Sequence, residues 1–284
     1  TLAGLLNALK LAGKKLSDAR IVLLGAGASN TTIARLILAD GGDPEKLVLF
    51  DSKGSLHSGR KDIESDPAFY RKWELCKKTN PQHYGSEAEA LKGADVLIAL
   101  STPGPDTVKR EWVHSMAPKS IVFACANPVP EIWPYAAKEE GAFIVATGRG
   151  DFPNQVNNSV CFPGILKGAL TVRAKKITDA MAIKCAHSIA DFAEKRGISP
   201  DNITATMSET EVYAQEAADV AMQAIADGVA RVSMSWDEVY AKAKADIATS
   251  RAMFDSLQEE GFIAKPSSAM LNEAFKWAVE QVKK

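Results

Sequence analysis

Five short runs of consecutive apolar residues mark the first half of the chain, and stretches with helical spacing of apolar side chains separate them. Continuous apolar runs are typical of strands that are buried on both faces of a parallel sheet, and parallel neighbours need a crossover, usually a helix, between them. The pattern therefore predicts an α/β fold with a doubly wound parallel sheet. The predicted strands lie at residues 21–24, 47–50, 96–100, 120–125 and 142–146.

The first predicted strand runs into a turn that contains Gly25 and Gly27, and a helix follows. Two glycines allow the sharp turn and the close approach of a ligand, and the helix start presents free N–H groups to an anion. Asn30 stands where the G-x-G-x-x-G pattern has its third glycine, and the second strand ends at Asp51, where an acid that binds a ribose is expected. The unit predicts a dinucleotide site; an ordinary strand-to-helix turn with Asp51 solvated or capping is the alternative.

The strand pattern ends near Pro163, and long helical periodicities follow it. We therefore expect a Rossmann-like nucleotide-binding domain at residues 1–165 and a helical extension at residues 166–284 that packs on it. In the first part we also expect a helix at residues 66–78, with Phe69, Tyr70 and Trp73 as buried anchors. In the second part helices are predicted at residues 177–194, 209–227, 236–259 and 267–283.

Charge and cysteine content narrow the possible partners. The 34 basic and 35 acidic side chains are interleaved, so no surface for nucleic acid is expected. Cysteines 76, 125, 161 and 185 form no C-x-x-C pair, which favours a reducing, cytoplasmic compartment. No apolar run approaches the length of about 18 residues that a membrane span needs, so no membrane partner is expected. The chain starts at Thr1 within a helical pattern, and we expect a further segment upstream.

Polar side chains follow three of the predicted strands. Ser101 and Thr102 follow the third strand, Asn127 follows the fourth, and the run 151–158 follows the fifth. Side-chain amides both donate and accept hydrogen bonds, so they suit a small polar acid beside a nicotinamide, although asparagines are equally common in turns and caps. The histidines show no metal-ligand spacing, and no proton-transfer residue is evident. We therefore assign no catalytic or metal-ligating residue within this chain.

Five segments, taken together, identify a resemblance to a known family. Their order and their spread over essentially the whole chain resemble the short malic enzymes of bacteria and archaea. The segments are residues 1–10, 25–28, 51–54, 126–131 and 157–164.

The resemblance implies oxidation of L-malate with NAD or NADP, decarboxylation to pyruvate and CO2, and a need for Mg²⁺ or Mn²⁺. It also implies a role for particular residues: Gly25, Gly27, Ala28, Ser29 and Asn30 at the pyrophosphate, Asp51 at the adenosine ribose, Ser101 and Thr102 near the cofactor centre, and Asn127 and Asn158 at the nicotinamide and malate.

In that family the tyrosine acid, the lysine base and the metal-binding carboxylates precede the segment that matches Thr1. The resemblance thus implies that these groups lie upstream, that this chain alone is inactive, and that the full enzyme is a homo-oligomer such as a dimer. Two alternatives stay open: a noncatalytic nucleotide-binding or assembly module, and another two-domain NAD(P)-dependent hydroxy-acid or amino-acid dehydrogenase. The doublet Asn157-Asn158 ahead of Phe162-Pro163-Gly164 argues against the second.

The sequence leaves the choice between NAD and NADP open, with a slight preference for NAD. Asp51 favours a free 2′-hydroxyl, whereas Lys53, Arg60 and Lys61 are placed to accept the extra phosphate of NADP or to form a solvated loop face.

Overall fold

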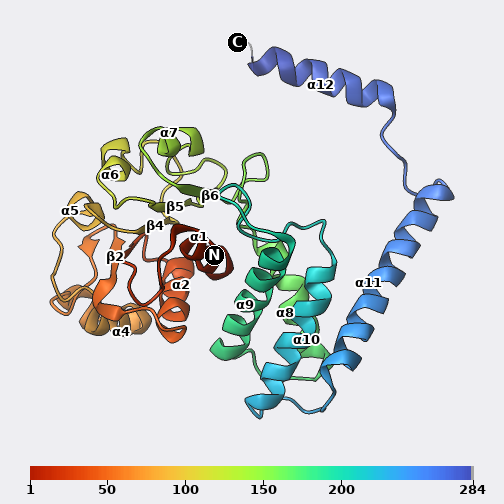
Figure 1. The fold of residues 1–284 in the computed structure, drawn as a ribbon, viewed down its shortest axis with the longest axis horizontal. Coiled ribbons are helices and arrows are strands. Elements are labelled where there is room, and N and C mark those ends of the chain that lie inside the picture. Colours follow the sequence, from red (N-terminus) through yellow and green to blue (C-terminus); the bar gives the residue numbers. More distant parts are fainter. Residues whose placement is uncertain (283–284) are drawn as a thin grey trace. The chain divides into compact units, whose positions relative to one another are not determined.

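The computed structural model describes residues 1–282 and contains one six-stranded sheet in the order β3-β2-β1-β4-β5-β6 (Figure 1). All neighbouring strands are parallel except β3, which pairs antiparallel with β2. The predicted doubly wound sheet is confirmed, and β3, a two-residue strand that no apolar run marks, is an addition. The strands are β1 (Ile21–Leu24), β2 (Leu47–Asp51), β3 (Gly54–Ser55), β4 (Val96–Ala99), β5 (Ile121–Ala124) and β6 (Ile144–Thr147).

The strand order reverses at β1, which pairs with β2 on one side and with β4 on the other. The chain first builds outward from β1 to β2 and β3, and then returns to the opposite side for β4, β5 and β6. Loops diverge at such a point, and this divergence opens a crevice at the carboxyl ends of the strands. The sheet topology therefore places a ligand site between the loops that follow β1 and β4.

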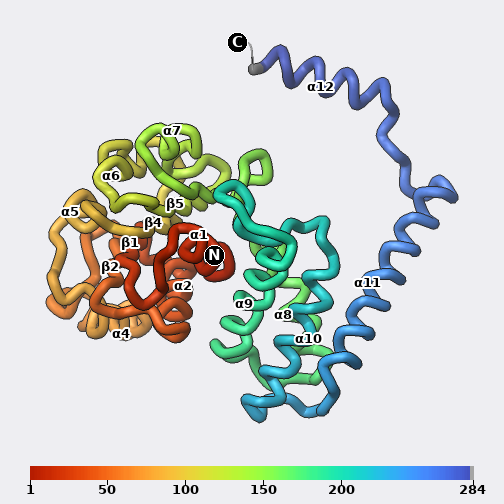
Figure 2. Tube along the Cα trace, viewed as in Figure 1, coloured from red at the N-terminus to blue at the C-terminus, as the bar shows by residue number. Residues whose placement is uncertain are grey.

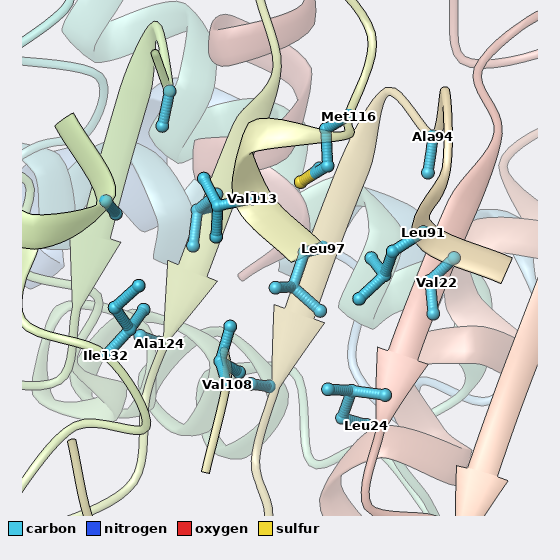
Figure 3. Packing of buried hydrophobic residues seen from close by; sticks show 14 of the residues in the cluster. Val22, Leu24, Leu91, Ala94, Leu97, Val108, Val113, Met116, Ala124 and Ile132 are labelled. Atoms are coloured by element: carbon cyan, nitrogen blue, oxygen red, sulfur yellow. The ribbon is translucent and has the colours of Figure 1, made fainter. Parts of the chain in front are cut away.

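Helices cover both faces of the sheet. On one face, α5 (Glu87–Leu91), α6 (Arg110–His114) and α7 (Pro134–Glu139) pack on strand side chains such as Leu97, which is completely buried (Figure 3). On the other face, α1 (Leu2–Ala12) brings Gly4 against the ring of Phe123 in β5, and α2 (Ala28–Ala39) packs beside α1. The sheet is therefore buried on both faces, as its continuous apolar strands predict.

The edge helices near β2 differ from the sequence prediction. In place of one helix over residues 66–78, a 3₁₀ turn (Pro67–Phe69) precedes α4 (Tyr70–Lys78). The expectation that Phe69 and Tyr70 are buried is wrong, because these side chains are 41% and 59% exposed. The turn, capped by Asp66, breaks the helical repeat on which that expectation rested. The other short elements are helix α3 (Lys61–Glu64), the 3₁₀ turn Pro44–Lys46 before β2, and the 3₁₀ turn Asn158–Val160 before α8.

Three helices, α8 (Phe162–Thr171), α9 (Asp179–Arg196) and α10 (Glu211–Ala226), pack against one another after the last strand (Figures 1 and 2). Gly168 of α8 permits a close approach to the backbone of α10, since a Cβ there would lie 2.5 Å from the carbonyl oxygen of Ala217. Asn7 of α1 ties this group to the sheet domain by donating to the carbonyl oxygens of Ala190 and Ile203 at 3.0 and 2.9 Å. The predicted helices at 177–194 and 209–227 are confirmed within two residues at each end, whereas α8 was not predicted.

The chain divides into two compact units, residues 1–240 and 241–284. Helix α11 (Trp236–Glu259) begins in the first unit, and α12 (Ser268–Val282) lies in the second; the predicted end of the last helix at Lys283 lies outside the described residues. The predicted domain boundary after residue 165 falls within α8 and stays a prediction. In the described chain, no helix combines the length and apolar character needed to cross a membrane.

Candidate functional site

The two glycines after β1 serve different purposes. Gly25 has φ +91°, and a Cβ at this position would lie 2.4 Å from the carbonyl oxygen of Leu100, so the loops after β1 and β4 can approach only because this residue is glycine. Gly27 has an ordinary φ of −79° and begins α2 without a side-chain cap. A Cβ on Gly27 would meet no described atom within 4 Å. Gly25 thus shapes the turn, and Gly27 keeps the space in front of α2 open.

The first turn of α2 points its unpaired backbone N–H groups into that space. Ala28 and Ser29 are exposed, and the first helical hydrogen bond after Gly27 is donated by Thr31. A helix N-terminus with free N–H groups and its positive dipole end binds phosphate oxygens well. The predicted positions Gly27, Ala28 and Ser29 therefore lie where a pyrophosphate would fit.

Asn30 has a different environment from the one expected. It is completely buried, and its Nδ2 donates to the carbonyl oxygen of Leu24 at 2.8 Å. Its side chain thus faces the end of β1, away from the space in front of α2, and it lines neither of the cavities described below. A hydrogen bond between helix and strand replaces here the close contact that a third glycine permits.

A cavity of about 380 Å³ lies on one side of the α2 N-terminus, and we name it the β1–β2 cavity. Asp51 at the end of β2 lines it, and Ser101 and Thr102, which follow β4, line it as well. The sequence-predicted cofactor residues Gly25, Gly27, Asp51, Ser101 and Thr102 are therefore brought together. The lining is completed by Leu24, Ala26, Phe50, Ser52, Lys72, Glu87, Thr107 and Trp112.

Asp51 is held by cations on two sides. Arg60 donates from Nη1 and Nη2 to the two carboxylate oxygens at 3.0 Å each, and Lys72 Nζ lies 3.5 Å from Oδ2. Arg60 also binds Asp62 through Nε and Nη2, at 2.8 and 2.9 Å. Partial burial alone would raise the pKa of Asp51, but the hydrogen bonds from Arg60 and the backbone N–H of Lys53 outweigh it and lower that pKa. Asp51 is therefore an ionised acceptor, and Arg60 is shared between two carboxylates.

A larger cavity of about 740 Å³ lies on the other side of the α2 N-terminus, and we name it the β5–β6 cavity. Asn127 follows β5 and Asn158 begins the 3₁₀ turn before α8, and both contribute to its wall. Ala28 and Ser29 of α2 line it as well, and Gly27, which precedes them, lines the β1–β2 cavity, so the start of α2 borders both cavities. No Asp, Glu, Lys, Arg or His side chain lines this second cavity in the described part of the chain.

The asparagines after β5 and β6 fall into two groups. Asn154 is buried and uses both ends of its amide, donating to the carbonyl oxygens of Val145 and Pro200 and accepting from the N–H of Ile203. Asn157 caps the 3₁₀ turn by accepting from Ser159 N at 2.9 Å. Asn127 and Asn158 are exposed, and neither amide has a hydrogen-bond partner among the described residues. These two amides are available to a ligand.

Glu131 connects the loops that carry the predicted site residues. It is completely buried, and its Oε1 accepts from the N–H of Ser101 at 2.8 Å and from its hydroxyl at 3.3 Å. Its Oε2 accepts from the N–H of Ala126 at 3.0 Å, next to the cis peptide between Asn127 and Pro128. The sequence analysis counted Glu131 only as part of a motif. Glu131 lies seven residues after the end of β5, and nothing in the local sequence distinguishes an exposed carboxylate at that position from a buried one that joins two loops.

The described residues contain no group of three or more His, Cys, Asp or Glu side chains that are arranged to hold a metal ion. The part of the chain described here therefore does not fit a Mg²⁺ or Mn²⁺ site of its own.

Comparison with known proteins agrees with this geometry. A family model described as "Malic enzyme, NAD binding domain" matches residues 1–225. The chain belongs to the malic enzyme family. It is 42% identical over 235 residues to a "Bifunctional malic/malolactic enzyme" of Bacillus subtilis, covering 82% of this chain and 55% of that protein. It is 39% identical over 231 residues to an "NAD-dependent malic enzyme" of Geobacillus stearothermophilus, covering 81% and 46%.

Solved structures of malic enzymes share the fold. The crystal structure of Entamoeba histolytica malic enzyme matches with a TM-score of 0.97 and 62% identity, over 100% of this chain and 58% of that one. The malic enzyme of Pyrococcus horikoshii matches with a TM-score of 0.84 and 42% identity, over 91% and 60%. The resemblance stated from the sequence is thus confirmed, and the alternative of a different dehydrogenase family is excluded. The chain spans about half the length of the curated relatives it matches.

Proposed function

We propose that this chain is the nucleotide-binding half of an enzyme that converts L-malate to pyruvate and CO2 with NAD or NADP. One observation carries the proposal: two cavities border the uncapped start of α2, one with an ionised acid and the other with two unpaired amides. A dinucleotide is a long ligand with an anionic centre, so it can place its pyrophosphate at α2 and its two nucleosides in the two cavities.

In the β1–β2 cavity, Asp51 accepts hydrogen bonds from the adenosine ribose, and Ser101 and Thr102 border the middle of the cofactor. We propose NAD as the preferred cofactor. A free 2′-hydroxyl can donate to the ionised Asp51, whereas a 2′-phosphate would be repelled by it. Arg60, the obvious phosphate ligand, already binds the carboxylates of Asp51 and Asp62.

In the β5–β6 cavity, Asn127 and Asn158 orient the nicotinamide and the malate. A side-chain amide can donate to a malate carboxylate and accept from its hydroxyl, so it fixes the orientation of the substrate without moving a proton. Hydride transfer from C2 of malate also needs a base for the C2 hydroxyl proton. We propose that this base, the acid that protonates the enolpyruvate, and the Mg²⁺ or Mn²⁺ ligands belong to a segment upstream of Thr1.

The experiment compares this chain with the same chain joined to the segment encoded upstream of Thr1. Calorimetric titration with NAD and NADP should detect binding to both proteins, because all proposed cofactor residues lie within the chain. NAD(P)H formation from malate with Mn²⁺ should be seen only in the longer protein. Robust turnover by the 284-residue chain would contradict the division of roles, and a longer protein that binds nucleotide but never oxidises malate would favour a noncatalytic nucleotide-binding module.

We also propose that the longer protein is a homo-oligomer, such as a dimer, and that it is located in the cytoplasm. Light scattering of the longer protein and fractionation of cells that express it would test the two.

A further inference from the structure

Two cysteines from different helices meet behind the wall of the β5–β6 cavity. Cys161, at the start of α8, is partly exposed and lines the cavity, whereas Cys185 in α9 is completely buried. Their Sγ atoms lie 3.6 Å apart, and both cysteines are in the thiol form. Cys185 Sγ also lies 3.6 Å from Oε2 of Glu216 in α10. The proposed reaction uses neither sulfur.

We propose that Cys161 and Cys185 form a redox-sensitive dithiol, which a hydroperoxide closes into a disulfide that reversibly switches off malate turnover. The part of this proposal that concerns turnover rests on the proposed function; the formation of the disulfide does not.

The reaction has two steps. The Cys161 sulfur attacks one oxygen of the hydroperoxide, the O–O bond breaks, and a sulfenic acid and an alcohol or water are formed. The Cys185 sulfur then attacks the sulfenic sulfur, an S–S bond forms, and the S–O bond breaks. The departing hydroxide takes the thiol proton of Cys185 and leaves as water. Two electrons pass from the two thiols to the hydroperoxide, which is the only oxidant required.

The surroundings of the four cysteines single out Cys161 as the attacking thiol. Burial raises the pKa of Cys125 to about 12 and that of Cys76 to about 11, so both resist ionisation at neutral pH. The hydrogen bond with Cys185 lowers the pKa of Cys161, and the cavity gives it solvent access. Since the thiolate is the nucleophile, a partly exposed thiol of low pKa beside a second sulfur has the features of a redox-sensitive pair.

The disulfide would alter the proposed malate site directly. An S–S bond is about 2.05 Å long, so the sulfurs must approach by about 1.5 Å. The backbone N–H of Cys161 donates to the carbonyl oxygen of Asn158 at 3.0 Å, and this bond fixes the turn that presents the Asn158 amide. Movement of Cys161 toward α9 therefore displaces Asn158, whereas the start of α2 and Asp51 lie on other elements and are unaffected.

The test uses the longer protein that carries the upstream segment, first fully reduced and then treated with a few equivalents of hydrogen peroxide. Alkylation and peptide mapping should find Cys161 linked to Cys185. Malate turnover should fall more than tenfold, the Kd for NAD should stay within about twofold, and dithiothreitol should restore turnover. Absence of the linked peptide, or a linked protein with unchanged turnover, would overturn the proposal.

Three variants separate this pair from other oxidation sites. For Cys161→Ser and for Cys185→Ala, malate turnover after peroxide treatment should equal the turnover of the same variant before treatment. Cys76→Ala should lose turnover as the parent does. If peroxide inactivates Cys161→Ser and Cys185→Ala to the same extent as the parent, the oxidation that stops turnover occurs at another residue, and the proposed switch is refuted. A reduced protein without malate turnover would refute the proposed function. Peptide mapping needs no activity, so it would still decide whether Cys161 and Cys185 form a disulfide.

Discussion

The two cavities on either side of the α2 N-terminus differ in how their polar groups are satisfied. In the β1–β2 cavity, the Asp51 carboxylate is already paired with Arg60 and Lys72. In the β5–β6 cavity, no charged side chain lines the described wall, and the amides of Asn127 and Asn158 have no partner in the described chain. The first cavity is preorganised for one end of a ligand, whereas the second offers uncharged amides that can orient a ligand.

The largest expected effect concerns the glycine between the cavities. Gly27→Val should weaken NAD binding by more than about 100-fold, because its branched side chain occupies the open space that the pyrophosphate needs. Its stability should change little, since a Cβ at Gly27 contacts no described atom. Titration calorimetry and thermal unfolding measure the two effects.

Gly25→Ala is the matched control for this prediction. Its Cβ would collide with the Leu100 carbonyl, so this variant should lower the free energy of unfolding itself. Equal NAD binding by Gly27→Val and the parent would refute the position of the pyrophosphate.

The second prediction addresses the β5–β6 cavity alone. Asn158→Ala in the longer protein should lower malate kcat/KM by an amount that corresponds to about 1–3 kcal/mol, because the partner of the amide is left unpaired, and NAD affinity should change much less. Steady-state kinetics and titration test the two parts. Asn154→Ala is the contrasting variant, and it should mainly lower the melting temperature because its amide is buried and fully bonded within the protein. Unchanged kinetics in Asn158→Ala would remove this residue from the site.

The third prediction concerns the helices behind the β5–β6 cavity. Burial raises the pKa of Glu216 to about 10, well above its value in an unfolded chain. Above about pH 4.5 the folded state therefore holds a proton that the unfolded state releases. The contribution of Glu216 to the free energy of unfolding should be greatest below about pH 4.5 and should fall as the pH rises toward 10. Between pH 5 and 8 the loss of stability that this group causes should be about 4 kcal/mol, since each pH unit contributes about 1.4 kcal/mol.

Glu216→Gln keeps the shape of the neutral carboxyl group without its proton equilibrium. Chemical denaturation at several pH values should show a flatter profile for this variant than for the parent. Parallel profiles for the two proteins would show that Glu216 titrates normally in the folded state.

The smallest expected effect is on cofactor choice in the β1–β2 cavity. Asp51→Ala should weaken NAD binding and strengthen NADP binding, each by less than about tenfold, because it removes an acceptor for the 2′-hydroxyl and releases Arg60 toward a 2′-phosphate. Titration of parent and variant with both cofactors is the measurement. A parent that clearly prefers NADP would show that the preference proposed here is reversed.

The sequence predicts the layers of this fold better than the details of its site. Strands such as Val96–Ala99 are buried on both faces, so a continuous apolar run marks them, and helix α11 matches its predicted bounds at Trp236 and Glu259. Helices α6 and α7 span only five and six residues, too few for a periodic pattern to stand out.

Residue type and spacing predict that Asp51 and Gly27 face a common space, and the structure brings both to one cavity, because they lie at fixed offsets from strand and helix ends. The same reasoning does not separate Asn154 from Asn158, which differ in burial and not in chemistry. It also leaves open whether Arg60 faces a phosphate or two carboxylates, because a rotamer choice decides this. The partners of such side chains come from distant segments, as with Glu131 and the loops after β4 and β5.

Asn30 has a consequence for how dinucleotide-binding chains are recognised in sequence databanks. A search that demands glycine at the third position of the fingerprint would pass over this chain, although its α2 sits on β1 as that fingerprint requires. The position here tolerates a side chain because the amide of Asn30 reaches the Leu24 carbonyl. Patterns that admit a short hydrogen-bond donor at this position would follow the physical constraint more closely than patterns that admit glycine alone.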